Sequence, residues 1–214
     1  MELTAPETRV LGCLLEKELA TPNAYPLTLN AALAAANQTS NRDPVVAYDE
    51  AEVTDALAGL RQKGAARVVL GSGQRAEKYR HTLEEVWGLD DQHRAVLAVM
   101  MLRGPQTVGE LRQRTERLAR FDSLAEVEQV LRLLANREEP LARRLERGPG
   151  QKEARWVELF SGEAAALEAA ARTEGDGPSD EARPRSATEA LREEVAALRD
   201  EVEALRQQLN DLLH

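Results

Sequence analysis

Residues 52–60 read EVTDALAGL, and residues 126–134 read EVEQVLRLL. Both stretches place apolar side chains at their second, fifth, sixth and ninth positions, a spacing typical of one face of an α-helix. A second pair of stretches, residues 71–79 and 148–156, shares the pattern Gly-x-Gly-Gln and ends in an aromatic residue. The offsets are 74 and 77 residues, so the chain contains an approximate internal repeat that keeps its order.

Each repeat has the same predicted order of elements, with three helices followed by a hairpin that turns at glycines. The predicted helices cover residues 4–19, 27–37 and 50–63 in the first repeat, and residues 90–103, 107–119 and 124–136 in the second. The predicted strands cover residues 67–70 and 78–80, and then residues 141–145 and 155–160. Three helices and a hairpin in this order predict a winged helix, in which the second and third helices form the helix-turn-helix.

Polar residues stand where the predicted second and third helices begin. A side-chain oxygen at such a position accepts a hydrogen bond from a free backbone N–H of the first turn. The expected N-caps are Thr28, Thr107, Asp49 and Ser123. Glu52 and Glu126 follow two of them at the spacing of a capping box.

The sequence therefore predicts a mainly α protein with small β-hairpins, an α+β arrangement with two winged-helix domains in tandem. The predicted divisions are residues 1–88 and 89–160 for the two domains, 161–187 for an Ala-rich helix and flexible linker, and 188–214 for a coiled-coil helix. We call residues 1–88 the first repeat and residues 89–160 the second repeat.

The tail carries apolar residues at alternating spacings of four and three, which is typical of a coiled-coil seam. The seam residues are Leu191, Val195, Leu198, Val202, Leu205, Leu209 and Leu212. This pattern favours a parallel homodimer, in which Glu194 faces Arg199 and Glu201 faces Arg206 of the second chain. The alternative is a single amphipathic helix that packs on its own domain.

The amino-acid composition and charge indicate what kind of core and which partners to expect. Aromatic residues make up 3% of the chain, so the core is expected to be aliphatic, with Cys13 as a small core residue. The longest apolar runs are too short to cross a bilayer, and the start resembles no signal peptide, so we expect a cytoplasmic protein and no membrane partner. The net charge is −9, but residues 1–88 contribute −3, residues 89–160 contribute +1 and residues 161–214 contribute −7. The predicted globular part is thus nearly neutral, which weakens but does not exclude a nucleic-acid partner.

With the repeat in view, residues 3–160 resemble the YceH-like family of bacterial proteins of unknown function. The resemblance rests on strings that are specific to that family: LLEK at 14–17, YPL at 25–27, NQTSNRDPV at 37–45, GELR at 109–112 and LANRE at 134–138. Asp43 stands where the family pattern has Glu, a change that keeps the charge. The resemblance implies tandem winged helices and no known activity.

No arrangement of residues predicts catalysis, a metal site or a cofactor, so the chain is not expected to be an enzyme. His81, His93 and His214 have no partners at the spacing of metal ligands. The acidic residues Glu16, Glu18, Glu84 and Glu85 are interpreted as solvated helix faces.

The polar segment between the second and third helices of the first repeat is a candidate site. It contains Asn37, Gln38, Thr39, Ser40, Asn41 and Arg42. These side chains can bind phosphates or base edges, and they can equally hold a long connection in shape through local hydrogen bonds. We favour the structural interpretation.

Basic residues gather around the third helices and the hairpins. The candidate nucleic-acid-binding residues are Arg61, Lys63, Arg67, Arg75, Lys78, Arg112, Arg114, Arg143, Arg144, Lys152 and Arg155. Acidic residues interleave with them, so an ordinary solvated surface of mixed charge explains the pattern equally well. Acidic residues also open both third helices, where they would repel phosphate.

Two functions follow from these patterns. The first is a dimeric, regulatory protein that binds double-stranded DNA through its hairpins and flanking arginines. The second is a scaffold whose winged helices bind another protein and no DNA. Analogy at the level of fold favours DNA binding narrowly.

Overall fold

The helices and strands follow the predicted order in the computed structural model, which describes residues 1–69, 76–147 and 152–175. The first repeat contains α1 (Ala5–Ala20), the 3-10 helix η1 (Pro22–Ala24), β1 (Leu27–Thr28), α2 (Leu29–Ala36), α3 (Glu50–Gln62), β2 (Ala66–Val69) and β3 (Lys78–His81). The short helix α4 (Leu83–Trp87) leads into the second repeat. That repeat contains α5 (Asp91–Arg103), α6 (Val108–Arg114), α7 (Leu124–Ala135), β4 (Ala142–Arg144) and β5 (Trp156–Glu158), and α8 (Gly162–Gly175) follows it.

Each repeat contains a small antiparallel sheet. In the first, the strand order is β1-β3-β2, so the short strand before α2 pairs with the returning strand of the hairpin. In the second, β4 pairs with β5, and an isolated bridge joins Gln106 to Trp156. Gln106 stands just before α6, as β1 stands just before α2, so the two repeats share this third pairing.

The predicted N-caps are confirmed. The side chains of Thr28, Asp49, Thr107 and Ser123 each accept a hydrogen bond from a backbone N–H in the first turn of the following helix. Asp49 and Glu52 form the predicted capping box. The box predicted for Glu126 is wrong, because its carboxylate accepts hydrogen bonds from the Asp122 N–H and the Gln92 amide instead.

The second helices are shorter than predicted. In the first repeat, residues 27 and 28 belong to β1, and the helix begins at Leu29. In the second repeat, α6 ends at Arg114 instead of residue 119. There the Thr115 hydroxyl donates to the Leu111 carbonyl, and a turn carries the chain on toward α7.

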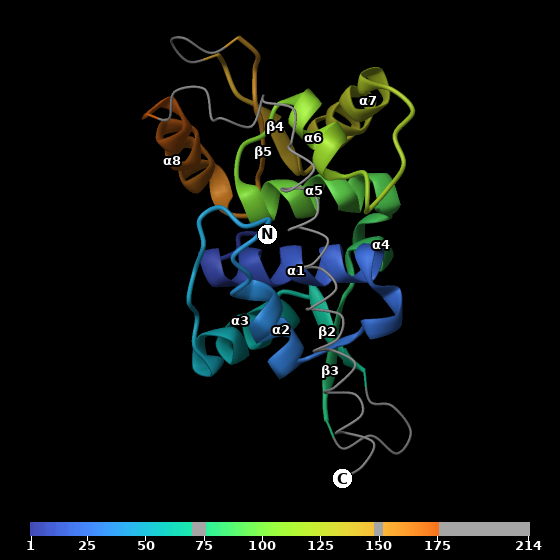
Figure 1. Cartoon of the computed structure of the whole chain (residues 1–214), viewed down its shortest axis with the longest axis vertical. Coiled ribbons are helices and arrows are strands. Elements are labelled where there is room, and N and C mark those ends of the chain that lie inside the picture. Colours follow the sequence, from blue (N-terminus) through green and yellow to red (C-terminus); the bar gives the residue numbers. More distant parts are fainter. Residues whose placement is uncertain (70–75, 148–151, 176–214) are drawn as a thin grey trace, which may run out of the picture. The chain divides into compact units, whose positions relative to one another are not determined.

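The core lies where α1 and α5 run side by side, with α2 and α3 beyond α1 and with α6 and α7 beyond α5 (Figure 1). The apolar faces of these two helices are buried, and so is Cys13, as predicted. The buried residues of the faces are Val10, Leu11, Leu14, Leu15, Val96, Leu97, Met100 and Met101. Residues Met1–Glu174 form one compact unit, mainly helical with small antiparallel sheets. The coarse fold class is therefore confirmed, and the boundary between residues 88 and 89 stays a prediction.

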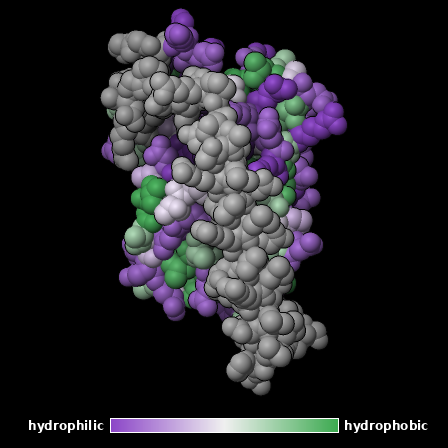
Figure 2. Space-filling view, viewed as in Figure 1, coloured by the Kyte–Doolittle hydropathy of each residue, from purple (hydrophilic) through white to green (hydrophobic). Residues whose placement is uncertain are grey.

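The described surface is mostly hydrophilic on the face drawn in Figure 2, with small hydrophobic areas between. The large hydrophobic residues that are exposed lie apart in the sequence: Met1, Val45, Val86, Leu124, Leu133 and Leu167. The predicted Ala-rich helix is α8. The predicted linker beyond residue 175 and the seam from Leu191 to Leu212 lie outside the described residues.

Candidate functional site

The polar segment after α2 is organised around Arg42, whose side chain is fully buried. Its guanidinium donates to the Ala35 carbonyl, to the Gln38 side chain and to both carboxylate oxygens of Glu16. A buried guanidinium requires such partners, because a charge without them is costly away from water. Arg42 therefore joins the segment to α1 and to the end of α2.

A second set of hydrogen bonds holds both ends of the connection between α2 and α3. Asn37 donates to the Tyr48 carbonyl and accepts from the Tyr48 N–H, both at 2.8 Å. Arg9 donates to the Pro44 carbonyl, and Asn41 accepts a hydrogen bond from Arg103 at 2.7 Å. The structural interpretation thus accounts for Asn37, Asn41 and Arg42, while Thr39 and Ser40 keep solvent contact. Binding by this segment stays a prediction.

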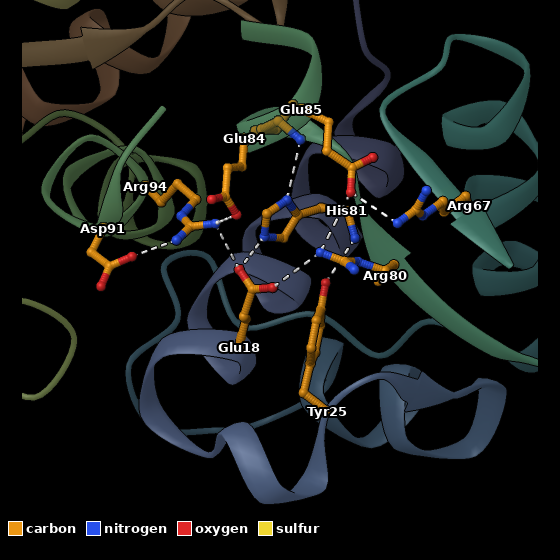
Figure 3. Close-up of polar contacts among 10 residues, drawn as sticks. Glu18, Tyr25, Arg67, Arg80, His81, Glu84, Glu85, Asp91 and Arg94 are labelled. Atoms are coloured by element: carbon orange, nitrogen blue, oxygen red, sulfur yellow. Dashed lines mark hydrogen bonds and ion pairs between the residues drawn. The ribbon is translucent and has the colours of Figure 1, made fainter. Parts of the chain in front are cut away.

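A buried polar cluster lies where β3 meets α1 and α5 (Figure 3). The Nε2 of His81 lies 2.5 Å from the Glu18 carboxylate, and its Nδ1 accepts a hydrogen bond from the Leu83 N–H. That arrangement places the ring proton on Nε2, where it is donated to Glu18. Arg94 of α5 contacts the same carboxylate at 3.1 Å, and the Tyr25 hydroxyl accepts from the His81 N–H.

The periphery of this cluster is ionic. Arg94 also pairs with Glu84 at 2.9 Å and with Asp91, and Arg80 lies 3.9 Å from Glu18. Burial opposes the ionisation of Glu18, but the hydrogen bond from His81 and the nearby charges together lower its pKa. The cluster ties the first repeat to the second.

The interpretation of Glu16 and Glu18 as solvated residues is wrong, because each binds a buried cation. Glu18 follows Leu14 by four residues and Leu11 by seven, so it lies on the apolar face of α1. That spacing was the signal for its burial. The sequence carries no comparable signal for the pairing of Glu16 with Arg42.

A different kind of buried acid lies at the end of β5. Glu158 is 5% exposed, and its carboxylate accepts hydrogen bonds from the backbone N–H groups of Phe160 and Ser161 and from the Ser161 hydroxyl. Burial outweighs these hydrogen bonds and raises the pKa of Glu158. This carboxylate shapes the turn that leads into α8.

The candidate basic residues of the first repeat divide into two groups. Lys63 pairs with Glu7 at 2.5 Å, and Arg67 pairs with Glu85 at 2.9 Å. Arg61 is exposed and Lys78 is half-buried, and neither forms an ion pair with a described residue. Arg75 lies outside the described residues.

The second repeat shows the same division. Arg155 pairs with Glu110 at 3.0 Å, Arg143 pairs with Glu163, and Arg114 donates to the Gln106 side chain. Three candidates are exposed and have no ion pair within the described part of the chain: Arg112, Arg144 and Lys152.

The acidic residues of the two third helices differ in their surroundings. On α3, Glu50 and Asp55 are exposed and pair with no described cation. On α7, the Glu126 carboxylate accepts hydrogen bonds from the Asp122 N–H and the Gln92 side-chain amide, and Glu128 pairs with Arg132 at 2.7 Å. Among the described acidic residues of these two helices, only Glu128 of α7 is paired with a cation, whereas Glu50 and Asp55 of α3 have no ion-pair partner.

Within the described residues, no group of His, Cys, Asp and Glu side chains is arranged to hold a metal ion. No described helix has the length and apolar character needed to span a membrane.

A family model described as "Protein of unknown function, DUF480" matches residues 3–151, well over half of the chain. The chain belongs to the DUF480 family. The resemblance to YceH-like proteins predicted this membership, and the match spans most of both repeats of the DUF480 chain. The predicted coiled coil lies beyond the matched residues.

Relatives of this DUF480 chain occur in several bacteria. A UPF0502 protein of Geobacter metallireducens is 58% identical over 160 residues, which cover 75% of this chain and 73% of the relative. A UPF0502 protein of Pelobacter propionicus is 48% identical over 92% of this chain and 93% of the relative. One from Mesorhizobium japonicum is 48% identical over 91% of each chain. None of these names assigns an activity, so a function has to be argued from the site.

Proposed function

We propose that this protein is a dimeric, non-enzymatic DNA-binding regulator built from two winged-helix domains in tandem. The observation that carries the proposal is the shared topology of the repeats. Each has three helices and a hairpin, with a third pairing formed by the residues just before the second helix. This is the order of elements in a winged helix, a fold that commonly binds DNA, and the argument is one of analogy at the level of fold.

The positions of the free cations support contact with phosphates. Arg61 lies in the last turn of α3 and Lys78 is the first residue of β3, while Arg144 is the last residue of β4 and Lys152 precedes β5. Exposed cations near the loop end of a hairpin, such as Arg144 and Lys152, can approach a DNA backbone without breaking an ion pair with a described residue. Arg112 on α6 is a further exposed cation of the second repeat.

The dimer and the location are part of the same proposal. The seam from Leu191 to Leu212 would join two chains in a parallel coiled coil, and two chains would double the number of phosphate contacts. We place the protein in the cytoplasm, where bacterial DNA lies.

The test is a fluorescence anisotropy titration of labelled 40-base-pair duplexes, repeated between about 50 and 200 mM salt. Binding through phosphates predicts an affinity that falls steeply with salt. The double substitution Arg144→Ala and Lys152→Ala should flatten the slope of log affinity against log salt by about 2. Arg120→Ala is the control, because Arg120 is exposed but pairs with Asp122. A flat titration of the unmodified protein at about 50 mM salt contradicts DNA binding.

A second candidate function is a scaffold that binds another protein and no DNA. The exposed carboxylates of α3, Glu50 and Asp55, favour it, because they would repel phosphate. Scaffold function predicts a single partner protein that stays bound after nuclease treatment, together with no anisotropy change on any duplex.

A further inference from the structure

The third helices of the two repeats can be compared residue by residue. At the offset of 74, three apolar residues of α3 match three of α7, and all six are buried: Val53 and Val127, Leu57 and Leu131, Leu60 and Leu134. The two helices therefore present the same helical positions to solvent. Differences in residue type at these exposed positions therefore give the two helices different surfaces, while their buried faces stay alike.

The outward positions of the helices carry different chemistry. Asp55 of α3 corresponds to Gln129 of α7, Ala58 corresponds to Arg132, and Gln62 corresponds to Asn136. All six residues are exposed. Gln129 and Arg132 of α7 and its C-cap residue Asn136 follow one another at spacings of three and four, so they form one ridge, the α7 ridge.

The α7 ridge has the side chains that distinguish base pairs in the major groove. The amides of Gln and Asn can form two hydrogen bonds with adenine, and the guanidinium of Arg can form two with guanine. The α3 ridge has a carboxylate and a methyl group at the first two positions, and a carboxylate beside the phosphates opposes binding.

Residues next to the two ridges also favour contact of α7, and not of α3, with DNA. Glu128 is paired with Arg132, and a pair this exposed costs little to exchange for a contact with DNA. The helix that precedes each third helix also differs. α2 has no charged residue, whereas α6 carries Arg112, which is exposed.

We propose that the two repeats are not equivalent on DNA, and that only the α7 ridge reads base edges, through Gln129, Arg132 and the C-cap residue Asn136. α3 does not enter the groove, and the first repeat contributes at most contacts to the backbone. This inference rests on the proposed function, and it adds the surface and the residues that set sequence preference.

The experiment is a binding selection from a pool of duplexes with 20 randomised base pairs, followed by titration of the enriched duplex. The unmodified protein should enrich a defined sequence. Gln129→Ala combined with Arg132→Ala should abolish that preference and lower affinity for the enriched duplex by about tenfold or more. Arg132→Lys keeps the charge but loses the paired hydrogen bonds, so it should lose the preference while it keeps the salt dependence.

The matched control is Asp55→Ala combined with Gln62→Ala on α3, which should leave the enriched sequence unchanged. All of these side chains are exposed, and thermal unfolding checks that each variant is folded. The inference is overturned if the α7 variants enrich the same sequence as the unmodified protein, or if the α3 variant changes it. In both cases DNA binding itself still stands. If the unmodified protein binds no duplex, the proposed function fails, and this inference fails with it.

Discussion

A guanidinium nitrogen of Arg42 lies 2.7 Å from the carboxylate of Glu16, and the Arg42 side chain is wholly buried. The pair connects the polar segment after α2 to the middle of the structure, since Glu16 belongs to α1. The same guanidinium also donates to the Ala35 carbonyl at the end of α2. Arg42 is thus bound from both sides, and its contacts are internal to the chain.

Replacement of Arg42 by Ala should lower the free energy of unfolding by about 3–5 kcal/mol, because it leaves Glu16 without its cation and Ala35 without a donor. Urea denaturation measures the change. Arg112→Ala is the control, since Arg112 is exposed, and it should stay within about 0.5 kcal/mol of the unmodified protein. A loss below about 1 kcal/mol for Arg42→Ala would mean that the segment is not anchored through this residue.

The His81–Glu18 contact predicts a dependence of stability on acid pH. Folding lowers the pKa of Glu18 from 4.5. The ionised carboxylate therefore stabilises the folded state fully above pH 4.5, and this stabilisation is lost as the pH falls through the lower pKa of the folded state. Glu18→Gln should cost about 3 kcal/mol at pH 7. The difference from the unmodified protein should shrink as the pH drops below 4.5.

Urea denaturation at several pH values between about 3 and 7 tests this prediction. Glu138→Gln provides the comparison, since Glu138 is exposed. A penalty for Glu18→Gln that stays constant over the whole range would show that the charge of Glu18 is not what stabilises the cluster.

Sequence patterns over a few residues predicted most of the helices and strands. They did not predict contacts between residues that lie far apart in the chain. The order of the helices, the four N-caps and the hairpin strands follow from periodicity and from polar residues at helix starts, which are patterns within a few residues of one another. The lengths of the second helices did not follow from them. The partners of Glu16 and Glu18 come from other elements. Only the position of Glu18 on the apolar face gave a local sign of burial.

The candidate site shows the same limit. The sequence placed basic residues near the hairpins, but it could not tell Arg144, which is exposed, from Arg155, which pairs with Glu110. It treated the acidic starts of both third helices alike. The contacts of Glu126 with Asp122 and Gln92 depend on the loop before α7 and on α5, so the difference between the helices emerged only in three dimensions.

Glu158 predicts a pH dependence opposite to that of Glu18. Its pKa is raised from 4.5, so the folded state holds the proton more tightly, and stability declines as the pH rises from 4.5 through the higher pKa of the folded state. Glu158→Gln removes this ionisation and should make the protein more stable than the unmodified chain at pH 7. Thermal unfolding at pH 4.5 and pH 7 should show the advantage growing with pH, and an advantage that does not grow contradicts the prediction.

Gly12 explains how α1 and α5 come so close. A Cβ atom at Gly12 would lie 3.0 Å from Leu102 Cγ and 3.0 Å from Met101 Cβ, tighter than ordinary contact. Glycine within a helix costs about 1 kcal/mol relative to alanine, and here that cost permits the close packing of the two repeats.

Gly12→Val should therefore lower the free energy of unfolding by about 1–3 kcal/mol, since the added atoms must push the two helices apart. Gly109→Ala is the matched control, because Gly109 also lies in a helix but its nearest neighbour, Thr107 Oγ1, is 3.9 Å from the added carbon. That variant should keep or gain stability, by up to about 1 kcal/mol. If urea denaturation shows the two variants to be equally stable, α1 and α5 do not pack through Gly12.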